Sequence, residues 1–218
     1  MANRLAGWKL LGLFGAIALP IWWVNFRSDE RGGRQLPRSQ NIYKTQPLVM
    51  KGGDPYIRAL MRTITASEAN VAQPYHVLYG GKYVADLSDH PNRCVPIVTG
   101  PNIGQCSTAA GRYQFLNITW YEKAERYHPN PSNLLWWQSY SFEPKYQDAV
   151  VYAWLSDPQA WGVDISQRLR EGELEEVLRL LSGTWTSLGY GIESNSMSPY
   201  LSQIYKRVLR EELKSSQV

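Results

Sequence analysis

Residues 54–70 read DPYIRALMRTITASEAN and form the segment around which the rest of the chain is organised. Asp54 favours the start of a helix as an N-cap, and Pro55 suits the first helical position, where its missing N–H costs nothing. Apolar residues then recur at helical spacing, namely Ile57, Leu60, Met61 and Ile64. This pattern predicts a helix with one apolar face.

Glu68 is on the same predicted face, four residues beyond Ile64 and seven beyond Met61. Desolvation at the end of an apolar stripe disfavours the charged form of a carboxyl group and raises its pKa. A carboxylic acid that keeps its proton near neutral pH can cleave a glycosidic bond by general acid catalysis. The alternative is a solvated glutamate at the frayed end of the helix, and this helix alone favours that alternative because most glutamates are surface residues.

The composition narrows the class of partner. The chain has 218 residues, a formal net charge of +4, nine Trp, 14 Tyr and four Phe. Amphipathic rings in such numbers suit a cleft that stacks on sugars, although they also suit any core or interface. The charge fits an anionic polymer such as nucleic acid, acidic lipid or cell wall. Zinc-finger spacing, a basic stripe and a nucleotide-binding glycine loop do not occur in the sequence, so nucleic acid ranks low as a partner.

Residues 8–26 read WKLLGLFGAIALPIWWVNF, and such a segment is long enough to cross a bilayer, which takes roughly 17–25 residues. We expect an uncleaved signal anchor over residues 1–26, because the apolar run continues past the possible cleavage site after Ala18. The alternative is a removed signal peptide. Arginines and a lysine occur on both sides of the segment, so the charge rule does not settle its orientation.

The remaining chain is divided into a flexible linker over residues 27–47 and a globular domain over residues 48–218. Residues 75–89 predict a β-hairpin region, with Gly80 and Gly81 at a tight turn. Residues 87–104 predict a long loop or a second hairpin. Helical patterns cover residues 117–127, capped by Asn117, and residues 142–155, 173–181 and 199–213. A small hairpin region among several helices predicts an α+β domain.

Cys94 and Cys106 are the only cysteines and bracket this loop. In an oxidising compartment a disulfide would close the loop and stabilise the fold by roughly 2–4 kcal/mol. Two unpaired thiols are the alternative. A thiol nucleophile is not expected, since neither cysteine has a convincing histidine partner.

Several short motifs occur in an order that resembles the phage lambda lysozyme (endolysin) family of lytic transglycosylases. They are ASE at 66–68, YGG at 79–81, DLSDHP at 86–91, STAAGRYQ at 107–114, QDAV at 147–150, WTSL at 185–188 and GYG at 189–191. The similarity covers most of residues 55–209. Each motif alone is weak, and the set in this order is specific.

The resemblance implies a lysozyme-like α+β fold with a cleft between a helical lobe and a small hairpin lobe. It implies that Glu68 is the catalytic acid and that the GRYQ motif lines the cleft. Among the expected substrate-binding residues, Tyr113, Gln114 and Tyr190 would hold the N-acetyl group and the sugar ring, and Ser107 would shape the cleft floor. A hydrogen-bonded core role for Tyr113 is the main alternative. Phage members of the family lack the apolar N-terminus, carry Gly where Ala69 stands here, and have a shorter loop at the cysteines.

The family works with a single catalytic acid, which implies a lytic transglycosylase that forms 1,6-anhydro-N-acetylmuramic acid. A hydrolytic muramidase is the first alternative, because Asp86 or Asp89 could act as the second carboxylate that such an enzyme needs. A non-catalytic peptidoglycan-binding protein of the cell envelope is the second.

The expected partners are peptidoglycan glycan strands, and the membrane through the N-terminal segment. We expect a monomer that requires no cofactor and acts at the extracytoplasmic, periplasmic face of the cell envelope. His76, Asp86, Asp89 and His90 could be read as a metal site, but their spacing fits no established ligand pattern, so no metal is predicted.

Overall fold

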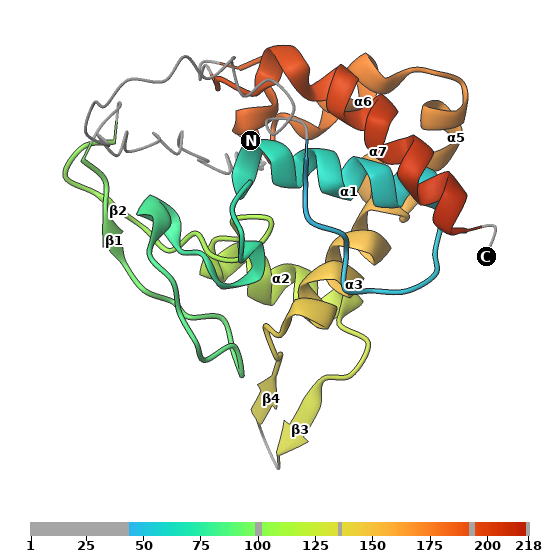
Figure 1. The fold of residues 1–218 in the computed structure, drawn as a ribbon. Coiled ribbons are helices and arrows are strands. Elements are labelled where there is room, and N and C mark those ends of the chain that lie inside the picture. Colours follow the sequence, from blue (N-terminus) through green and yellow to red (C-terminus); the bar gives the residue numbers. More distant parts are fainter. Residues whose placement is uncertain (1–43, 99–101, 135–136, 192–194, 217–218) are drawn as a thin grey trace, which may run out of the picture.

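The computed structural model describes residues 44–98, 102–134, 137–191 and 195–216. Figure 1 shows helix α1 (Pro55–Glu68) at the centre of the molecule, between α7 (Leu201–Ser215) on one side and α3 (Pro144–Leu155) on the other. The other helices are α2 (Asn117–Tyr127), α4 (Pro158–Trp161), α5 (Ile165–Arg170) and α6 (Leu174–Leu181).

Helix α1 starts as its sequence predicts. The Asp54 carboxylate accepts hydrogen bonds from the backbone N–H of Tyr56 and Ile57, and Pro55 follows as the first helical residue. The remaining capping prediction is wrong in detail, because Asn117 is the first residue of α2 and Leu116 is its N-cap. The Asn117 side chain instead accepts a hydrogen bond of 2.9 Å from Thr108.

The prediction of a single buried face on α1 is incomplete, since residues 59–68 are all buried. Three hydroxyl groups outside the apolar face donate to backbone carbonyls of the same helix: Thr63 to Ala59, Thr65 to Met61 and Ser67 to Ile64. Their hydrogen-bonding needs are met within the helix, so these residues can also be buried in the core.

Arg62 is a buried charge on α1 and is fully paired. Its guanidinium contacts Glu212 at 2.8 Å and Glu211 at 2.7 Å, both on α7, and donates to the Thr45 carbonyl at 3.0 Å. Residues 45–47, which the sequence places in the linker, are therefore attached to the domain. Burial of an arginine is tolerable only with such partners.

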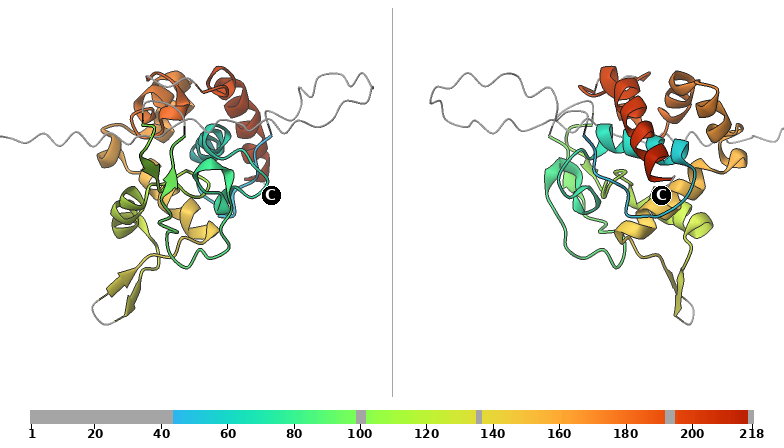
Figure 2. Two further views of the ribbon diagram at one scale, coloured as in Figure 1. Left: turned by 90° about the vertical axis from the view of Figure 1, so that its left-hand side faces the viewer. Right: turned by 45° about the vertical axis from the view of Figure 1, so that its right-hand side comes forward.

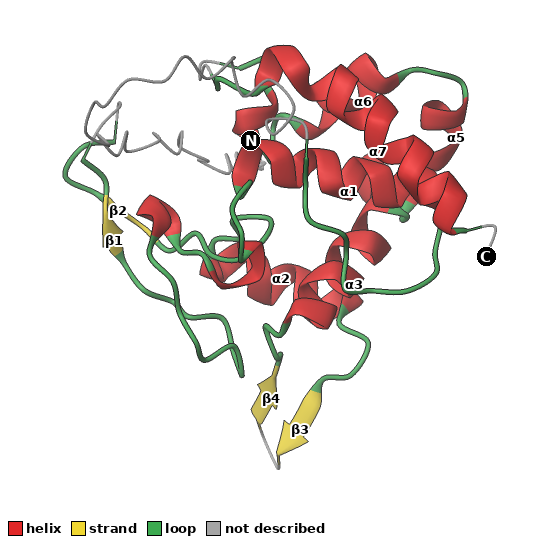
Figure 3. Ribbon diagram, viewed as in Figure 1, coloured by secondary structure: helices red, strands yellow, loops and turns green. Residues whose placement is uncertain are grey.

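Strands are short and lie away from the helical body (Figure 3). Strands β1 (Val95–Pro96) and β2 (Cys106–Ser107) pair antiparallel, in the register Val95↔Ser107. For residues 87–104 the sequence predicts a long loop or a second hairpin, and β1 and β2 form the hairpin. Strands β3 (Ser132–Leu134) and β4 (Trp137–Ser139), which the sequence reading missed, also pair antiparallel and project from the body (Figure 2).

The predicted hairpin over residues 75–89 is wrong as a strand ladder. The segment contains two 3-10 turns, η1 (Pro74–His76) and η2 (Tyr79–Gly81), and a single antiparallel bridge between Val77 and Tyr83. Gly80 and Gly81 both have positive φ, so the tight turn itself is present. The pairing stays short: the Leu78 N–H donates to the Lys82 carbonyl at 2.6 Å and the Val84 N–H to the His76 carbonyl at 2.9 Å, while Leu78 also bridges to Ala110.

Among the described residues, we find no helix with the length and apolar character needed to span a membrane. The expected anchor over residues 1–26 lies outside the described residues.

Candidate active site

Glu68 is the last residue of α1 and its side chain is buried, with 3% of its surface exposed. The hydroxyl of Ser187 donates a hydrogen bond to Glu68 Oε1. Ser187 belongs to the short 3-10 helix η3 (Thr186–Leu188), which packs against this end of α1. The buried position predicted for Glu68 is therefore present, and the solvated alternative is not.

The helix ends at Glu68 without a glycine. Ala69 has φ −149° and ψ 53°, and its N–H donates to the Thr65 carbonyl at 2.8 Å. A negative φ of this size is open to residues with a side chain, so alanine fits where phage relatives carry glycine.

Arg112 forms the centre of a buried polar network behind α1. Its guanidinium donates to Thr65 Oγ1 at 2.8 Å, to the Tyr75 hydroxyl at 2.9 Å and to the carbonyls of Gln46 and Pro47. Arg112 itself has no exposed surface. Arg112 was expected to line a cleft, but its side chain points into the core instead.

Tyr113 is also directed inward, with its hydroxyl donating to Asp148 Oδ1 at 2.7 Å. Burial, together with the charge of the Asp148 carboxylate, raises the pKa of Tyr113 well above its usual value. The tyrosine therefore remains a hydrogen-bond donor. This is the core role that the sequence left open as the alternative to substrate binding.

Gln114 lies at a strained turn, with φ +47°. Its side-chain amide donates to the carbonyls of Gly111 and Val77, at 2.9 and 3.3 Å. Its Oε1 is buried and has no hydrogen-bond partner within the described part of the chain. Unpaired buried acceptors are rare, and non-glycine residues with positive φ gather at functional sites, so Gln114 stays a candidate site residue.

Ser107 is buried in β2 and accepts a hydrogen bond from the Ala109 N–H at 3.1 Å, which closes a local turn. Thr108 bonds to Asn117 and so joins this turn to the start of α2. In these contacts, Ser107 and Thr108 hold the segment that leads into α2.

Tyr190 is 47% exposed and has φ +68°. Its hydroxyl donates to Glu175 of α6, and the Arg179 guanidinium lies over its ring at 5.1 Å. Burial of the hydroxyl end and the bonded Glu175 carboxylate raise the pKa of Tyr190 to about 12. One side of the ring is thus fixed while the residue keeps an open surface.

The two candidate second acids differ from Glu68. Asp86 is exposed, and its pKa is lowered because the Ser88 N–H and hydroxyl donate to its carboxylate. Asp89 accepts hydrogen bonds from the Tyr121 hydroxyl and the His90 N–H. Neither carboxyl group lies in the environment of a buried acid.

No group of three or more metal-ligating side chains occurs within the described ranges. Nε2 of His90 bonds to the Phe115 carbonyl at 2.9 Å, and Nδ1 of His76 bonds to the Val84 carbonyl at 2.9 Å. Both histidines near the hairpin region are therefore held by hydrogen bonds to backbone carbonyls.

The predicted disulfide between Cys94 and Cys106 is present, with the two Cα atoms 5.3 Å apart. It closes the β1–β2 hairpin at its base, next to the Pro96↔Cys106 pair.

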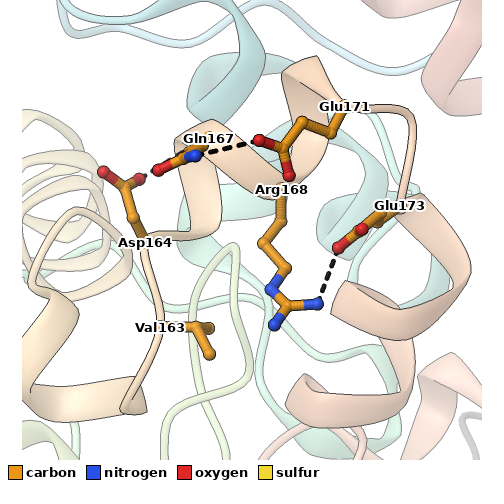
Figure 4. Close-up of a pocket in the computed structure, with 6 residues that line it drawn as sticks. All are labelled: Val163, Asp164, Gln167, Arg168, Glu171 and Glu173. Atoms are coloured by element: carbon orange, nitrogen blue, oxygen red, sulfur yellow. Dashed lines mark hydrogen bonds and ion pairs between the residues drawn. The ribbon is translucent and has the colours of Figure 1, made fainter.

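Two surface pockets lie elsewhere. One, of about 300 Å³, is lined by α5 and its flanks and contains the ion pair of Arg168 and Glu173 (Figure 4). The other, of about 570 Å³, lies between His76, the Asp86 turn and the start of α3. None of the five predicted catalytic and substrate-binding residues lines either pocket.

Sequence reasoning missed the roles of three buried polar residues. Ser187 was quoted in a motif but given no part in the site. Gln147 and Asp148 lie on the inner side of α3 with no exposed surface. Two polar residues inside an otherwise apolar helical pattern are the signal that could have marked them, because buried polar groups need partners.

Comparisons with known proteins identify a family and a fold. A family described as Endolysin matches residues 58–209. The Endolysin of Escherichia phage lambda is 30% identical over 127 residues, which span 54% of this chain and 64% of that protein, less than two thirds of its length.

Bacteriophage lambda lysozyme complexed with a chitohexasaccharide matches with a TM-score of 0.54 and 26% identity, over 73% of this chain and 97% of that one. A second structure, lysozyme from bacteriophage lambda, matches with a TM-score of 0.51 and 22% identity, over 76% and 96% of the two chains, and shows likeness of fold. The expected lysozyme-like α+β fold is confirmed. The match over residues 58–209 shows that this chain belongs to the Endolysin family.

Proposed function

We propose that this protein is a cell-wall lytic enzyme that cleaves the β-1,4 bond between N-acetylmuramic acid and N-acetylglucosamine in peptidoglycan. The observation that carries the proposal is the buried Glu68 carboxyl group at the end of α1, with the Ser187 hydroxyl bonded to it. Family membership supports the reaction class. The chitohexasaccharide bound by the lambda lysozyme supports a glycan substrate.

The proposed mechanism is that of a lytic transglycosylase. Protonated Glu68 gives its proton to the glycosidic oxygen, and the bond between that oxygen and the anomeric carbon of the muramic acid breaks. The 6-hydroxyl of the same sugar forms a new bond to that carbon and returns its proton to Glu68. No water is consumed, because the nucleophile belongs to the substrate and is already close to its target.

Burial supports the acid half of this cycle, because a low-dielectric environment disfavours a charged carboxyl group. The Ser187 hydroxyl supports the other half, because it can donate to the carboxylate that remains after the proton has left. One residue can then serve as acid and as base in turn.

The environments of the other acids favour the transglycosylase over the hydrolytic muramidase. A hydrolase needs a second carboxylate about 5–9.5 Å from the first. Asp148 is close to α1 in the fold, but its carboxylate accepts hydrogen bonds from the Tyr75 and Tyr113 hydroxyls. Asp86 and Asp89 are committed to their own turn and to α2.

The Cys94–Cys106 disulfide supports action outside the cytoplasm, because disulfides persist in oxidising compartments. A membrane anchor over residues 1–26 would hold the domain near the wall and remains part of this proposal. The proposal also keeps a linker over residues 27–47 and a catalytic domain over residues 48–218. It further includes a monomer that requires no cofactor.

Digestion of purified murein followed by mass spectrometry tests the reaction. The expected product is an anhydro-muropeptide, lighter by one water than the product of a muramidase. Glu68→Gln should abolish its release, since the amide cannot donate the required proton, while the Ser187 hydroxyl can still bond to the amide oxygen and preserve the fold.

The unfolding midpoint of Glu68→Gln provides the control for folding. Full activity in a folded Glu68→Gln variant would refute the role of Glu68. Products that carry an added water would show that the enzyme is a hydrolytic muramidase and not a lytic transglycosylase. Binding to murein without any cleavage by the wild type would favour the non-catalytic envelope protein.

A further inference from the structure

Ser187 has two hydrogen-bond partners at the end of α1. Its hydroxyl oxygen lies within hydrogen-bond reach of Glu68 Oε1 and 3.0 Å from the hydroxyl oxygen of Ser67. Both serines are buried. Because a serine has a single hydroxyl proton, Ser187 can donate to only one of these two partners at a time.

The direction of the second contact is set by Ser67. Its own hydroxyl donates to the Ile64 carbonyl at 3.0 Å, so its oxygen is left as an acceptor for Ser187. The Asn195 side-chain amide donates to the Ser67 carbonyl at 3.2 Å, which anchors this residue further. The geometry therefore offers the Ser187 proton two defined positions.

We infer that Ser187 and Ser67 act as a positioning pair that holds the Glu68 carboxyl in both of its protonation states. With ionised Glu68, Ser187 donates to the carboxylate. With protonated Glu68, the carboxyl O–H donates to Ser187, and Ser187 turns its own proton to Ser67. This inference rests on the proposed function, which requires Glu68 to give up and regain a proton in one catalytic cycle.

Other titratable groups near this end of α1 have partners elsewhere. Those on the neighbouring turns and helices are bonded away from Glu68 and comprise Tyr75, His76, Arg112, Tyr113, Asp148 and Tyr190. The acidic groups of α7 pair with Arg58 and Arg62. Ser187 bonds directly to Glu68, and Ser67 bonds to Ser187, so both serines can respond to the charge of Glu68.

The two serines should act in opposite directions. Ser187→Ala removes both the donor to the carboxylate and the acceptor for the carboxyl O–H. The bond to the charged form is the stronger of the two, so Glu68 should keep its proton to higher pH. The midpoint of the alkaline limb of the kcat/KM profile should move to higher pH by about one unit, as expected for one hydrogen bond to a charged group. Ser67→Ala removes the acceptor that Ser187 needs when Glu68 is protonated. The midpoint of the alkaline limb should therefore move to lower pH by about half a unit.

A matched control is available at the other end of the same helix. Ser166 donates to the carboxylate of Asp54 at 2.7 Å, and Ser166→Ala removes a comparable hydroxyl-to-carboxylate bond far from Glu68 along α1. Its pH profile should coincide with that of the wild type. Thermal unfolding of all three variants of the full chain separates a shift of the profile from a loss of fold.

The same shifts can be measured without substrate. The Glu68 side-chain signal, identified in a carboxyl-labelled NMR spectrum by its loss in Glu68→Gln, should titrate with a higher midpoint in Ser187→Ala and a lower one in Ser67→Ala. Midpoints that move in the same direction, or no further than in Ser166→Ala, overturn the inference. Should Ser187→Ala fail to fold, an unchanged or raised midpoint in Ser67→Ala overturns it alone. Absence of murein cleavage by the wild type would instead count against the proposed function, and the NMR titration would still decide the serine pair.

Discussion

The hydroxyl of Tyr75 donates a hydrogen bond of 2.8 Å to the Asp148 carboxylate and accepts one of 2.9 Å from Arg112. The tyrosine thus joins two buried charges that have no ion pair with each other among the described contacts. Arg112 continues to the carbonyls of Gln46 and Pro47, so the network ties the first described residues to α1 and α3. It also explains why Arg112 and Tyr113 of the GRYQ motif are directed into the core.

Tyr75→Phe should lower the free energy of unfolding by about 1–3 kcal/mol, because Arg112 loses an acceptor and Asp148 loses a donor in a buried site. Burial raises the pKa of Tyr75, so its hydroxyl is protonated over the whole working range. Urea denaturation measures the loss. Tyr83→Phe, at a residue that is half exposed, is the control and should change the stability by less than about 0.5 kcal/mol. Equal losses in the two variants would contradict the importance of the network.

Gly111→Ala should be strongly destabilising for two reasons. Gly111 has φ +73°, and a Cβ atom there would lie 2.3 Å from Gln147 Oε1, the acceptor for the Arg112 N–H. Gly172→Ala separates these causes, because Gly172 has φ +87° and open space around its Cβ position. The control should lose about 1–2 kcal/mol from backbone strain alone, and Gly111→Ala clearly more. Denaturation midpoints that coincide would show that the close approach does not matter.

Replacing Cys94 and Cys106 together by serine should lower the free energy of unfolding by about 2–4 kcal/mol, because the 12-residue closure no longer restricts the unfolded chain. The double variant avoids a free thiol. A reducing agent should destabilise the wild type by a similar amount and leave the double variant unchanged. A wild type that is insensitive to reduction would argue against this account.

Two buried histidines should make the fold sensitive to acid. In His90, Nε2 faces the Phe115 carbonyl while Nδ1 accepts from the Asn92 N–H, which suits the neutral ring only. Burial, the largest cause, lowers the pKa of His90 and of His128 below the ordinary value of 6.5. The unfolded chain therefore binds protons first, and stability is lost as the pH falls below about 6.5, towards the lower folded pKa.

The expected slope is at most about 1.4 kcal/mol per pH unit for each histidine. Denaturation at pH 7.5 and at pH 5 measures the loss, and His90→Gln should reduce it by removing one titrating group. A His90→Gln variant with an unchanged pH dependence would refute the assignment.

Tyr190 should act in substrate binding through its ring and not through its hydroxyl, because the hydroxyl already donates to Glu175. Tyr190→Ala should raise KM for murein fragments by about tenfold, equivalent to roughly 1.4 kcal/mol of lost contact. Tyr190→Phe should change KM much less. A larger effect of Tyr190→Phe than of Tyr190→Ala would point to the hydroxyl instead.

Local sequence patterns determined much of the helical framework. Asp54 and Pro55 fixed the start of α1, and apolar spacing located α2, α3, α6 and α7 to within a few residues, because caps and the 3.6-residue period act over short distances. The cysteine pair was also readable, since two cysteines allow one bridge. Glu68 continues the stripe of α1, but the helix alone favoured a solvated glutamate, and it was the ordered set of motifs that pointed to a catalytic acid.

The tertiary structure alone decided the rest. Residues 75–89 form turns with one short bridge, and Leu78 also pairs with Ala110, far along the chain. Tyr113 turns inward because Asp148 on α3 receives its hydroxyl, and Glu68 meets Ser187 across 119 positions of sequence. The direction of a polar side chain is set by whichever partner the fold brings to it, and no local period or spacing contains that information.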